Sequence, residues 1–195
     1  CHITGNRGVY PIDSFSHFDS GFRILNGEHP FKDYWIVSGF FVDYFQSLIF
    51  LLFGVSWQSY ILNASLLNGF ISTLVYYLFT KLGLDLKSSF FYSICFALLA
   101  YPSSGTPFVD HHSAFLSLIS VIFLILAIKT KKSYFWFLIP FFLFLGFLSK
   151  QVPATYIFII VILIISFHLL QQTKKESFNI ISVLFTSSLF SIILL

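Results

Sequence analysis

Three ionisable side chains stand where they could do chemistry at a membrane surface. Asp13 opens an amphipathic stretch, Asp110 lies in a loop before an apolar run, and Lys150 ends another apolar run. A carboxylate so placed could take a proton from an incoming hydroxyl. An ammonium could meet an anionic lipid headgroup or a phosphate leaving group. Asp13 and Asp110 are therefore the candidate catalytic residues, and Lys150 is a candidate phosphate ligand.

Each of these residues also has a structural interpretation. An aspartate before an amphipathic run is commonly a helix N-cap, a role that can coexist with catalysis. A lysine at the end of a span can snorkel to the interface. His111 and His112 follow Asp110, but adjacent histidines point in different directions on a helix, so this pair alone does not predict a zinc site. No cofactor is predicted, and a bound divalent metal stays an open alternative.

A second group of polar residues consists of binding candidates. The turn containing Lys32 and Asp33 is made rigid by Pro30 and could hold a phosphate or a sugar hydroxyl, although such loops are usually only solvated turns. Asp19 could pair with Arg23 four residues later on a helix. The candidates for substrate or phosphate binding are Lys150, Lys32, Asp33, Asp19 and His111.

The elements that position these residues are membrane helices. Apolar residues make up 57% of the chain and charged residues 10%, against about 25% charged in soluble domains. The apolar residues form long runs, and about 20 such residues cross a bilayer. The predicted spans are 60–79, 113–128, 134–148, 153–170 and 178–195, with a shorter one at 88–101.

The basic residues indicate which way these spans cross. Seven of the eleven lie in three short breaks between spans, so they are a topology signal and not a nucleic-acid patch. Each neighbouring pair of breaks is separated by two spans, which places all three breaks on one side. By the positive-inside rule that side is cytoplasmic. The loop 101–112 and the turn at 150–153 then face outward.

The segment 36–53 decides where the N-terminal region lies. Gly39, Asp43, Gln46 and Ser47 form one polar helical stripe on an apolar surface, the pattern of a helix lying in the interface. If this segment does not span, six of the eight acids lie on the outer side. Residues 13–25 form a second amphipathic helix, which Asn26 and Gly27 would cap.

The predicted fold is therefore all-α. Residues 1–58 form a first periplasmic or lumenal loop with two interfacial helices, and residues 59–195 form a transmembrane bundle of about six spans. We expect the sequence to be a piece of a longer chain, truncated at both ends, because it has no methionine, starts at Cys1 and stops inside an apolar run.

The order of these features resembles the integral-membrane C-type glycosyltransferases that use polyprenyl-phosphate sugars, including the protein O-mannosyltransferase and lipid A aminoarabinose transferase types. The likeness runs along most of the chain. It is carried by Asp13 in PIDSFSHFDSGFRILNG, by GFFVDYFQSLIFLLFG, by Asp110 in GTPFVDHHSAF and by Lys150 in FLGFLSKQVPA. The first acidic motif of the family is often Asp-Glu, whereas Ser14 follows Asp13 here. Lys32 is a candidate substitute for a cation that the family places before its second interfacial helix.

The resemblance implies transfer of a sugar from a polyprenyl-phosphate carrier to a lipid, glycan or protein acceptor on the outer side of a bacterial inner membrane. Asp13 would be the general base or would orient the acceptor, Asp110 would form a second acidic wall, and Lys150 would stabilise the leaving phosphate. The expected partners are the lipid-linked donor, the acceptor and membrane lipids. The main alternative is a transporter or flippase of a lipid-linked or anionic substrate, and a structural membrane subunit is a third interpretation.

Overall fold

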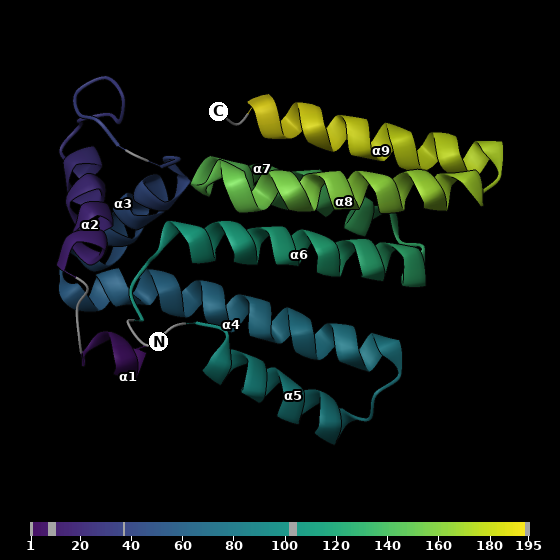
Figure 1. Cartoon of the computed structure of the whole chain (residues 1–195), viewed down its shortest axis with the longest axis horizontal. Helices are drawn as coiled ribbons and strands as arrows, with labels where there is room; N and C mark the ends of the chain where they lie inside the picture. Colours follow the sequence, from purple (N-terminus) through teal and green to yellow (C-terminus); the bar gives the residue numbers. More distant parts are fainter. Residues whose placement is uncertain (1, 8–10, 37, 102–104, 194–195) are drawn as a thin grey trace. The chain divides into compact units, whose positions relative to one another are not determined.

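Every regular element that the structure describes is a helix (Figure 1). The computed structural model describes residues 2–7, 11–36, 38–101 and 105–193, without the side chains of residue 2 and residues 11–14. The helices in chain order are α1 (His2–Gly5), α2 (Pro11–Leu25), α3 (Phe41–Phe53), α4 (Trp57–Leu82), α5 (Leu86–Leu99), α6 (Val109–Thr130), α7 (Ser133–Ser149), α8 (Gln151–Leu170) and α9 (Lys174–Ile193). The prediction of an all-α membrane fold is confirmed.

Four of these helices are long and apolar enough to cross a membrane. They are α4, α6, α8 and α9, with 26, 22, 20 and 20 residues. At about 1.5 Å per residue, α5 with 14 residues and α7 with 17 extend over about 21 and 26 Å, less than the roughly 30 Å of a hydrocarbon core. The predicted count of about six spans therefore remains a prediction for α5 and α7.

The chain forms two compact units, which are described separately. The first unit comprises residues 1–112 and 148–150, and the second comprises residues 113–147 and 151–195. In the first unit α3 packs against both α2 and α4. An aromatic cluster holds this packing, because the ring of Phe18 lies 5.0 Å from that of Phe50 and 5.3 Å from that of Tyr60.

The orientation of α3 differs from what its sequence pattern suggested. The polar stripe is buried: Asp43 and Gln46 are 1% and 0% exposed. The exposed face is apolar and carries Leu51 and Leu52, each about two-thirds exposed. Only residues 41–53 of the segment are helical. A place for α3 at the membrane surface stays a prediction. The exposure of its apolar face now supports it, because its polar stripe is buried.

Local signals explain where the first unit's helices begin and end. Gly27 follows α2 with a φ of 89°, which a glycine adopts without strain, so the predicted cap is confirmed. The side chain of Ser56 accepts from the backbone N–H of Ser59, and the Ser59 hydroxyl accepts from that of Ser56, which forms a capping box for α4. Gly83 ends α4 in the left-handed conformation. The helix α5 then returns along α4, where the Asn68 amide donates to the Ala97 carbonyl at 2.8 Å.

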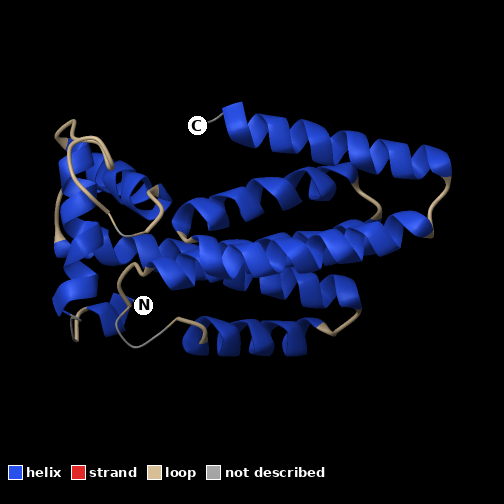
Figure 2. Cartoon of the chain, turned by 45° about the horizontal axis from the view of Figure 1, so that its top comes forward, coloured by secondary structure: helices blue, strands red, loops and turns tan. Residues whose placement is uncertain are grey.

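In the second unit the helices are joined by small and polar side chains. The Ser120 hydroxyl of α6 donates to the Ile139 carbonyl of α7 at 2.9 Å, and the Ser187 hydroxyl of α9 donates to the Phe137 carbonyl of α7. Such contacts are a common means of joining helices in a bilayer. Figure 2 shows α8 and α9 as long helices joined by a short turn. Their apolar side chains are largely exposed, as expected for surfaces that meet lipid.

Candidate active site

A cavity of about 570 Å³ lies within the first unit and brings together several of its charged side chains. Its walls come from α2, from the loop between α2 and α3, from α3, from the start of α6 and from Lys150, which lies between α7 and α8. The polar side chains that line it are Ser16, His17, Asp19, Ser20, Arg23, Tyr34, Ser38, Asp43, Asp110 and Lys150. Because it combines acids, cations and a histidine, we take this cavity as the candidate active site.

Asp110 and Lys150 form an ion pair in this cavity. The Lys150 Nζ donates to Asp110 Oδ1 at 2.7 Å, although the two residues are 40 positions apart. Both side chains are more than a third exposed, and such pairs contribute about 0–1 kcal/mol to stability. The pair therefore does little for the fold. Asp110 lies in the first turn of α6, where the helix dipole favours a carboxylate.

A close backbone contact fixes the position of Lys150. The backbone N–H of Gly39 donates to the Ser149 carbonyl at 3.1 Å. A Cβ at position 39 would lie 1.9 Å from the Leu148 carbonyl oxygen, a distance that no side chain can adopt. Glycine at this position lets the loop before α3 lie directly against the residues that precede Lys150.

His17 and Asp43 form a second pair at the cavity wall, and it is more buried than the first. His17 Nδ1 lies 2.7 Å from Asp43 Oδ1, with the two side chains 9% and 1% exposed. Burial raises the pKa of Asp43 above its ordinary value, and the hydrogen bond from His17 partly opposes that rise. The pair links α2 to α3 and presents both residues to the cavity.

Arg23 organises the more exposed edge of the cavity. Its guanidinium donates to Asp19 at 2.7 Å and to Glu28 at 3.1 Å, and it lies 5.3 Å from the centre of the Tyr34 ring. The hydrogen bond to Asp19 is the main reason that the pKa of Arg23 is raised. Burial raises the pKa of Tyr34 to about 12. The predicted i, i+4 pairing of Asp19 with Arg23 is present, and Asp19 also lines the cavity.

A buried chain of amides supports the cavity from behind. The Asn63 amide donates to Gln46 Oε1 at 3.0 Å, and its Oδ1 lies 2.8 Å from His112 Nε2. His112 Nδ1 lies 3.1 Å from the Phe108 carbonyl. These side chains are almost fully buried, so their hydrogen bonds fix α3, α4 and the start of α6 relative to one another. Asp110 is two residues before His112 and is positioned by the same contacts.

The sequence-predicted site residues divide into three groups. Asp110, Lys150 and Asp19 line the cavity. Three others are not among its lining residues. Lys32 is exposed, and Asp33 accepts a hydrogen bond from the backbone N–H of His29 at 2.8 Å and so shapes the turn. His111 packs against the rings of Tyr101 and Phe108. Asp13 belongs to the first turn of α2, but its side chain lies outside the described residues.

Several cavity residues were not singled out from the sequence as site residues. His17 could have been recognised because it follows Asp13 by one helical turn, and Asp43 because it lies on a polar stripe of an apolar helix. Asn63, which supports the cavity, lies inside an apolar run and carries no such signal. No group of three or more His, Cys, Asp or Glu that could hold a metal ion occurs among the side chains that the structure describes.

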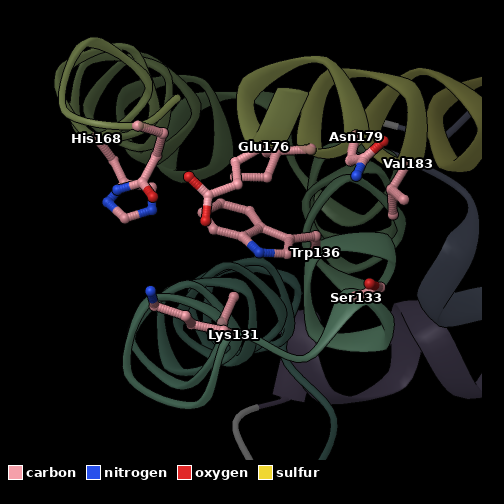
Figure 3. A pocket seen from close by; sticks show the side chains of 10 residues that line it. Lys131, Ser133, Trp136, His168, Glu176, Asn179 and Val183 are labelled. Carbon is pink, nitrogen blue, oxygen red and sulfur yellow. The ribbon is translucent and has the colours of Figure 1, made fainter. Parts of the chain in front are cut away.

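A smaller cavity of about 160 Å³ lies within the second unit (Figure 3). His168 stacks on Trp136 at 5.5 Å, and Lys131 and Glu176 also line the space. The Glu176 carboxylate is already engaged, because it accepts from the backbone N–H and the hydroxyl of Thr173. It therefore caps α9. A third cavity, of about 440 Å³, is lined mostly by apolar side chains of α7, α8 and α9. We therefore prefer the 570 Å³ cavity of the first unit as the reaction site over both of these.

The fold and the cavity define a class: an integral membrane protein with several apolar helices and a charged cavity at the ends of some of them. A family model described as dolichyl-phosphate-mannose-protein mannosyltransferase matches residues 30–194, which is most of the chain. The chain therefore belongs to this family of membrane C-type glycosyltransferases, as its sequence pattern predicted. No curated protein and no solved structure matches the chain.

Membership of the family establishes the general activity. The protein is a membrane glycosyltransferase of the mannosyltransferase type, a class that uses polyprenyl-phosphate sugar donors. This favours the transferase over the transporter. The matched residues include Asp43, Asp110 and Lys150, whereas Asp13 and His17 precede them.

Proposed function

We propose that the protein transfers a hexose from a polyprenyl-phosphate carrier to a hydroxyl of a lipid, glycan or protein acceptor, on the outer side of a bacterial inner membrane. The observation that carries the proposal is the Asp110–Lys150 pair in a charged cavity of a chain that belongs to this family. The donor is a phosphodiester whose leaving group is a phosphate. A cation held at the cavity wall is the group that such a reaction needs.

The reaction requires one bond to form and one to break. The acceptor oxygen attacks the anomeric carbon of the sugar, the bond from that carbon to the phosphate oxygen breaks, and the acceptor proton passes to a base. The polyprenyl phosphate leaves with one more negative charge than the donor carried. Lys150 stabilises this charge and, with three N–H donors, it keeps Asp110 as a partner. Asp110 lies on the side from which the acceptor approaches, and Asp13 stays a candidate general base from its place in the sequence.

The other predicted binding residues take lesser roles in this proposal. Asp19 holds Arg23 at the edge of the cavity, where a sugar hydroxyl could meet both. Lys150 and not Lys32 contacts the phosphate, because only Lys150 lines the cavity. Asp33 and His111 shape the loops that end at the site.

The test is a transfer assay on the full-length protein in lipid nanodiscs with labelled polyprenyl-phosphate hexoses. Lys150→Gln should lower kcat by about 10²–10³-fold, and Asp110→Asn should lower it by about tenfold or more, because the released lysine no longer keeps its place. Lys132→Gln, an exposed lysine outside the cavity, is the matched control and should transfer at the wild-type rate. Wild-type rates for Lys150→Gln would remove this residue from the reaction.

The side of the membrane is tested by labelling with a membrane-impermeant maleimide in cells. Cysteine replaces Lys32 or Lys132 in a background without Cys1 and Cys95. We expect label on Lys32→Cys and none on Lys132→Cys until the membrane is permeabilised, because basic breaks are cytoplasmic. Protection of both positions would mean that residues 36–53 cross the membrane and that the site does not face outward.

A further inference from the structure

We infer that the smaller cavity of the second unit binds the phosphate of an anionic membrane lipid. This cavity, of about 160 Å³, is lined by other residues than the candidate active site, and the proposed reaction does not use it. A lysine, a histidine and two side-chain amides line it at the ends of membrane-length helices. The inference goes beyond the proposed function and does not rest on it.

The cavity lies at the depth of the lipid headgroups. Its lining residues come from the places where α6 and α8 end and where α7 and α9 begin. With 22, 20 and 20 residues, α6, α8 and α9 extend over about 30–33 Å at about 1.5 Å per residue, which matches the roughly 30 Å of a hydrocarbon core. Helices of this length that cross the core end beside the lipid phosphates. A lipid phosphate is therefore the anion nearest to the cavity.

The polar side chains of the cavity are donors that suit a phosphate. Lys131 supplies an ammonium, and the amides of Gln172 and Asn179 supply N–H groups. The imidazole of His168 has a ring N–H in either neutral tautomer, so it can donate without a change of charge. Phosphate oxygens are strong acceptors, and charge-assisted hydrogen bonds from an ammonium are the stronger kind. This set of donors therefore fits a phosphate group.

Two of these donors are held in place by their surroundings. The ring of His168 stacks on that of Trp136, 5.5 Å away, and Trp136 is only 4% exposed. Figure 3 shows this indole between the side chains of Lys131, His168 and Glu176. Lys131 has a φ of 55°, which is uncommon for a lysine. Its backbone N–H donates to the Ala127 carbonyl at 2.9 Å, which ties the turn to α6.

The charge at this end of the unit favours an anion. The breaks 129–133 and 171–176 carry five lysines and one acid, Glu176. The lysines, all of them exposed, are Lys129, Lys131, Lys132, Lys174 and Lys175. Glu176 lines the cavity, but its carboxylate already accepts hydrogen bonds from the backbone N–H and the hydroxyl of Thr173. One acid offsets only one of the lysines, so this end stays positive, and basic pockets between membrane helices bind anionic lipid headgroups.

The surfaces beside the cavity suit the acyl chains of such a lipid. Phe167 and Leu170 lie near His168 at the end of α8 and are 65% and 84% exposed, and Phe178, next to Asn179 in α9, is 72% exposed. In a bilayer these side chains meet acyl chains, which stay in the hydrocarbon core when the phosphate enters the cavity. A lipid at this depth also loses less translational freedom on binding than an anion from solution. We therefore assign the cavity to a lipid and not to free phosphate or an acidic protein segment.

The experiment measures thermal unfolding of the full-length protein in nanodiscs of phosphatidylcholine with a rising fraction of phosphatidylglycerol. A ligand that binds only the folded protein stabilises it, so phosphatidylglycerol should raise the unfolding temperature of the wild type. In a second arm, millimolar glycerol phosphate is added to nanodiscs of phosphatidylcholine alone. It carries the same phosphate without acyl chains and should raise the unfolding temperature much less.

Two variants and a control test whether the cavity causes this rise. Lys131→Asn removes the charge and keeps the turn, because asparagine adopts a positive φ more readily than lysine does. The fraction of phosphatidylglycerol needed for a given rise should then increase about fivefold or more. Asn179→Ala removes an uncharged donor and should increase that fraction about two- to tenfold, which a general attraction between lysines and an anionic membrane would not do. Lys87→Gln, at an exposed lysine of a different basic break, should respond like the wild type.

Each outcome decides for or against the site. A wild type that phosphatidylglycerol does not stabilise would overturn the inference and favour an acidic protein segment as the partner of the lysines. Equal stabilisation by glycerol phosphate would overturn the assignment to a lipid. An unchanged response of Asn179→Ala, or equal weakening by Lys131→Asn and Lys87→Gln, would indicate general attraction and overturn the site. If Lys131→Asn does not fold, Asn179→Ala decides. Failure of the sugar-transfer assay would leave the inference standing, because no measurement here depends on transfer.

Discussion

Substitution of Gly39 by alanine tests whether the position of Lys150 depends on the backbone contact beside it. An alanine Cβ at position 39 would lie 1.9 Å from the Leu148 carbonyl oxygen, whereas real Cβ atoms essentially never come closer than 3.0 Å. The two backbone segments must therefore separate by about 1.1 Å. The obstacle is backbone and not the end of a flexible side chain, so no rotamer change relieves it.

The separation has two consequences that can be estimated. It breaks the hydrogen bond from the Gly39 N–H to the Ser149 carbonyl, which contributes about 1 kcal/mol, and overpacking of this kind costs about 1–3 kcal/mol in total. It also displaces Lys150, the next residue along. A misplacement of about 1 Å can lower a rate about 10²-fold, so we expect kcat/KM for the lipid-linked donor to fall by about 10- to 100-fold.

The measurement compares transfer rates and thermal unfolding of Gly39→Ala with those of the wild type. Gly69→Ala is the matched control, because Gly69 lies in α4 with nothing within 4 Å of the place that an alanine Cβ would occupy, so this substitution should change neither rate nor stability by much. In a Lys150→Gln background, Gly39→Ala should cost little further activity, since both act through the same ammonium. An equal loss in both backgrounds would refute this reasoning, as would a wild-type rate for Gly39→Ala.

Three further perturbations address stability. Asn63→Ala removes the hydrogen bonds of Asn63 to the buried Gln46 and His112 side chains, so it should lower the free energy of unfolding by at least about 1–3 kcal/mol. The control is Ser65→Ala, which removes only a local bond to the Ile61 carbonyl. It should change the free energy of unfolding by less than about 0.5 kcal/mol. Ser56→Ala should lower the thermal stability by the equivalent of about 1 kcal/mol, because it removes the cap of α4, and no loss would show that the cap is dispensable. Because the pKa of Asp43 is raised, the folded state binds the proton of its carboxyl group more tightly than the unfolded chain does. The free energy of unfolding should therefore fall as the pH rises from about 4 through the pKa of the folded state. Asp43→Asn should make the free energy of unfolding less dependent on pH over this range.

Much of the helical framework could be predicted because its signals are local. A run of apolar residues specifies a span by its length, and Gly27 marks the end of α2 because few other residues adopt its backbone conformation without strain. Asp110 and Lys150 could be proposed singly, from their places at the ends of apolar runs. Their pairing across 40 residues could not be predicted, because it depends on how Gly39 brings two backbone segments together.

The segment 36–53 shows where sequence periodicity stops being informative. A polar stripe says that one face of a helix differs from the other, but not which face meets lipid and which meets protein. In water the polar face turns outward, whereas next to a bilayer a partner that can hydrogen-bond is found inside the protein. For α3 the inside is where Asp43 meets His17 and Gln46 meets Asn63.

The two faces of α3 also explain how this site can be both polar and firmly placed. Turning the helix to expose Asp43 and Gln46 would bury Leu51 and Leu52 but would leave His17, Asn63 and their partners without hydrogen bonds, at roughly 1–3 kcal/mol for each buried group. The buried stripe therefore selects one rotation of α3. That rotation sets Asp43 against His17 at the cavity wall, so the same hydrogen bonds that orient the helix also build the site.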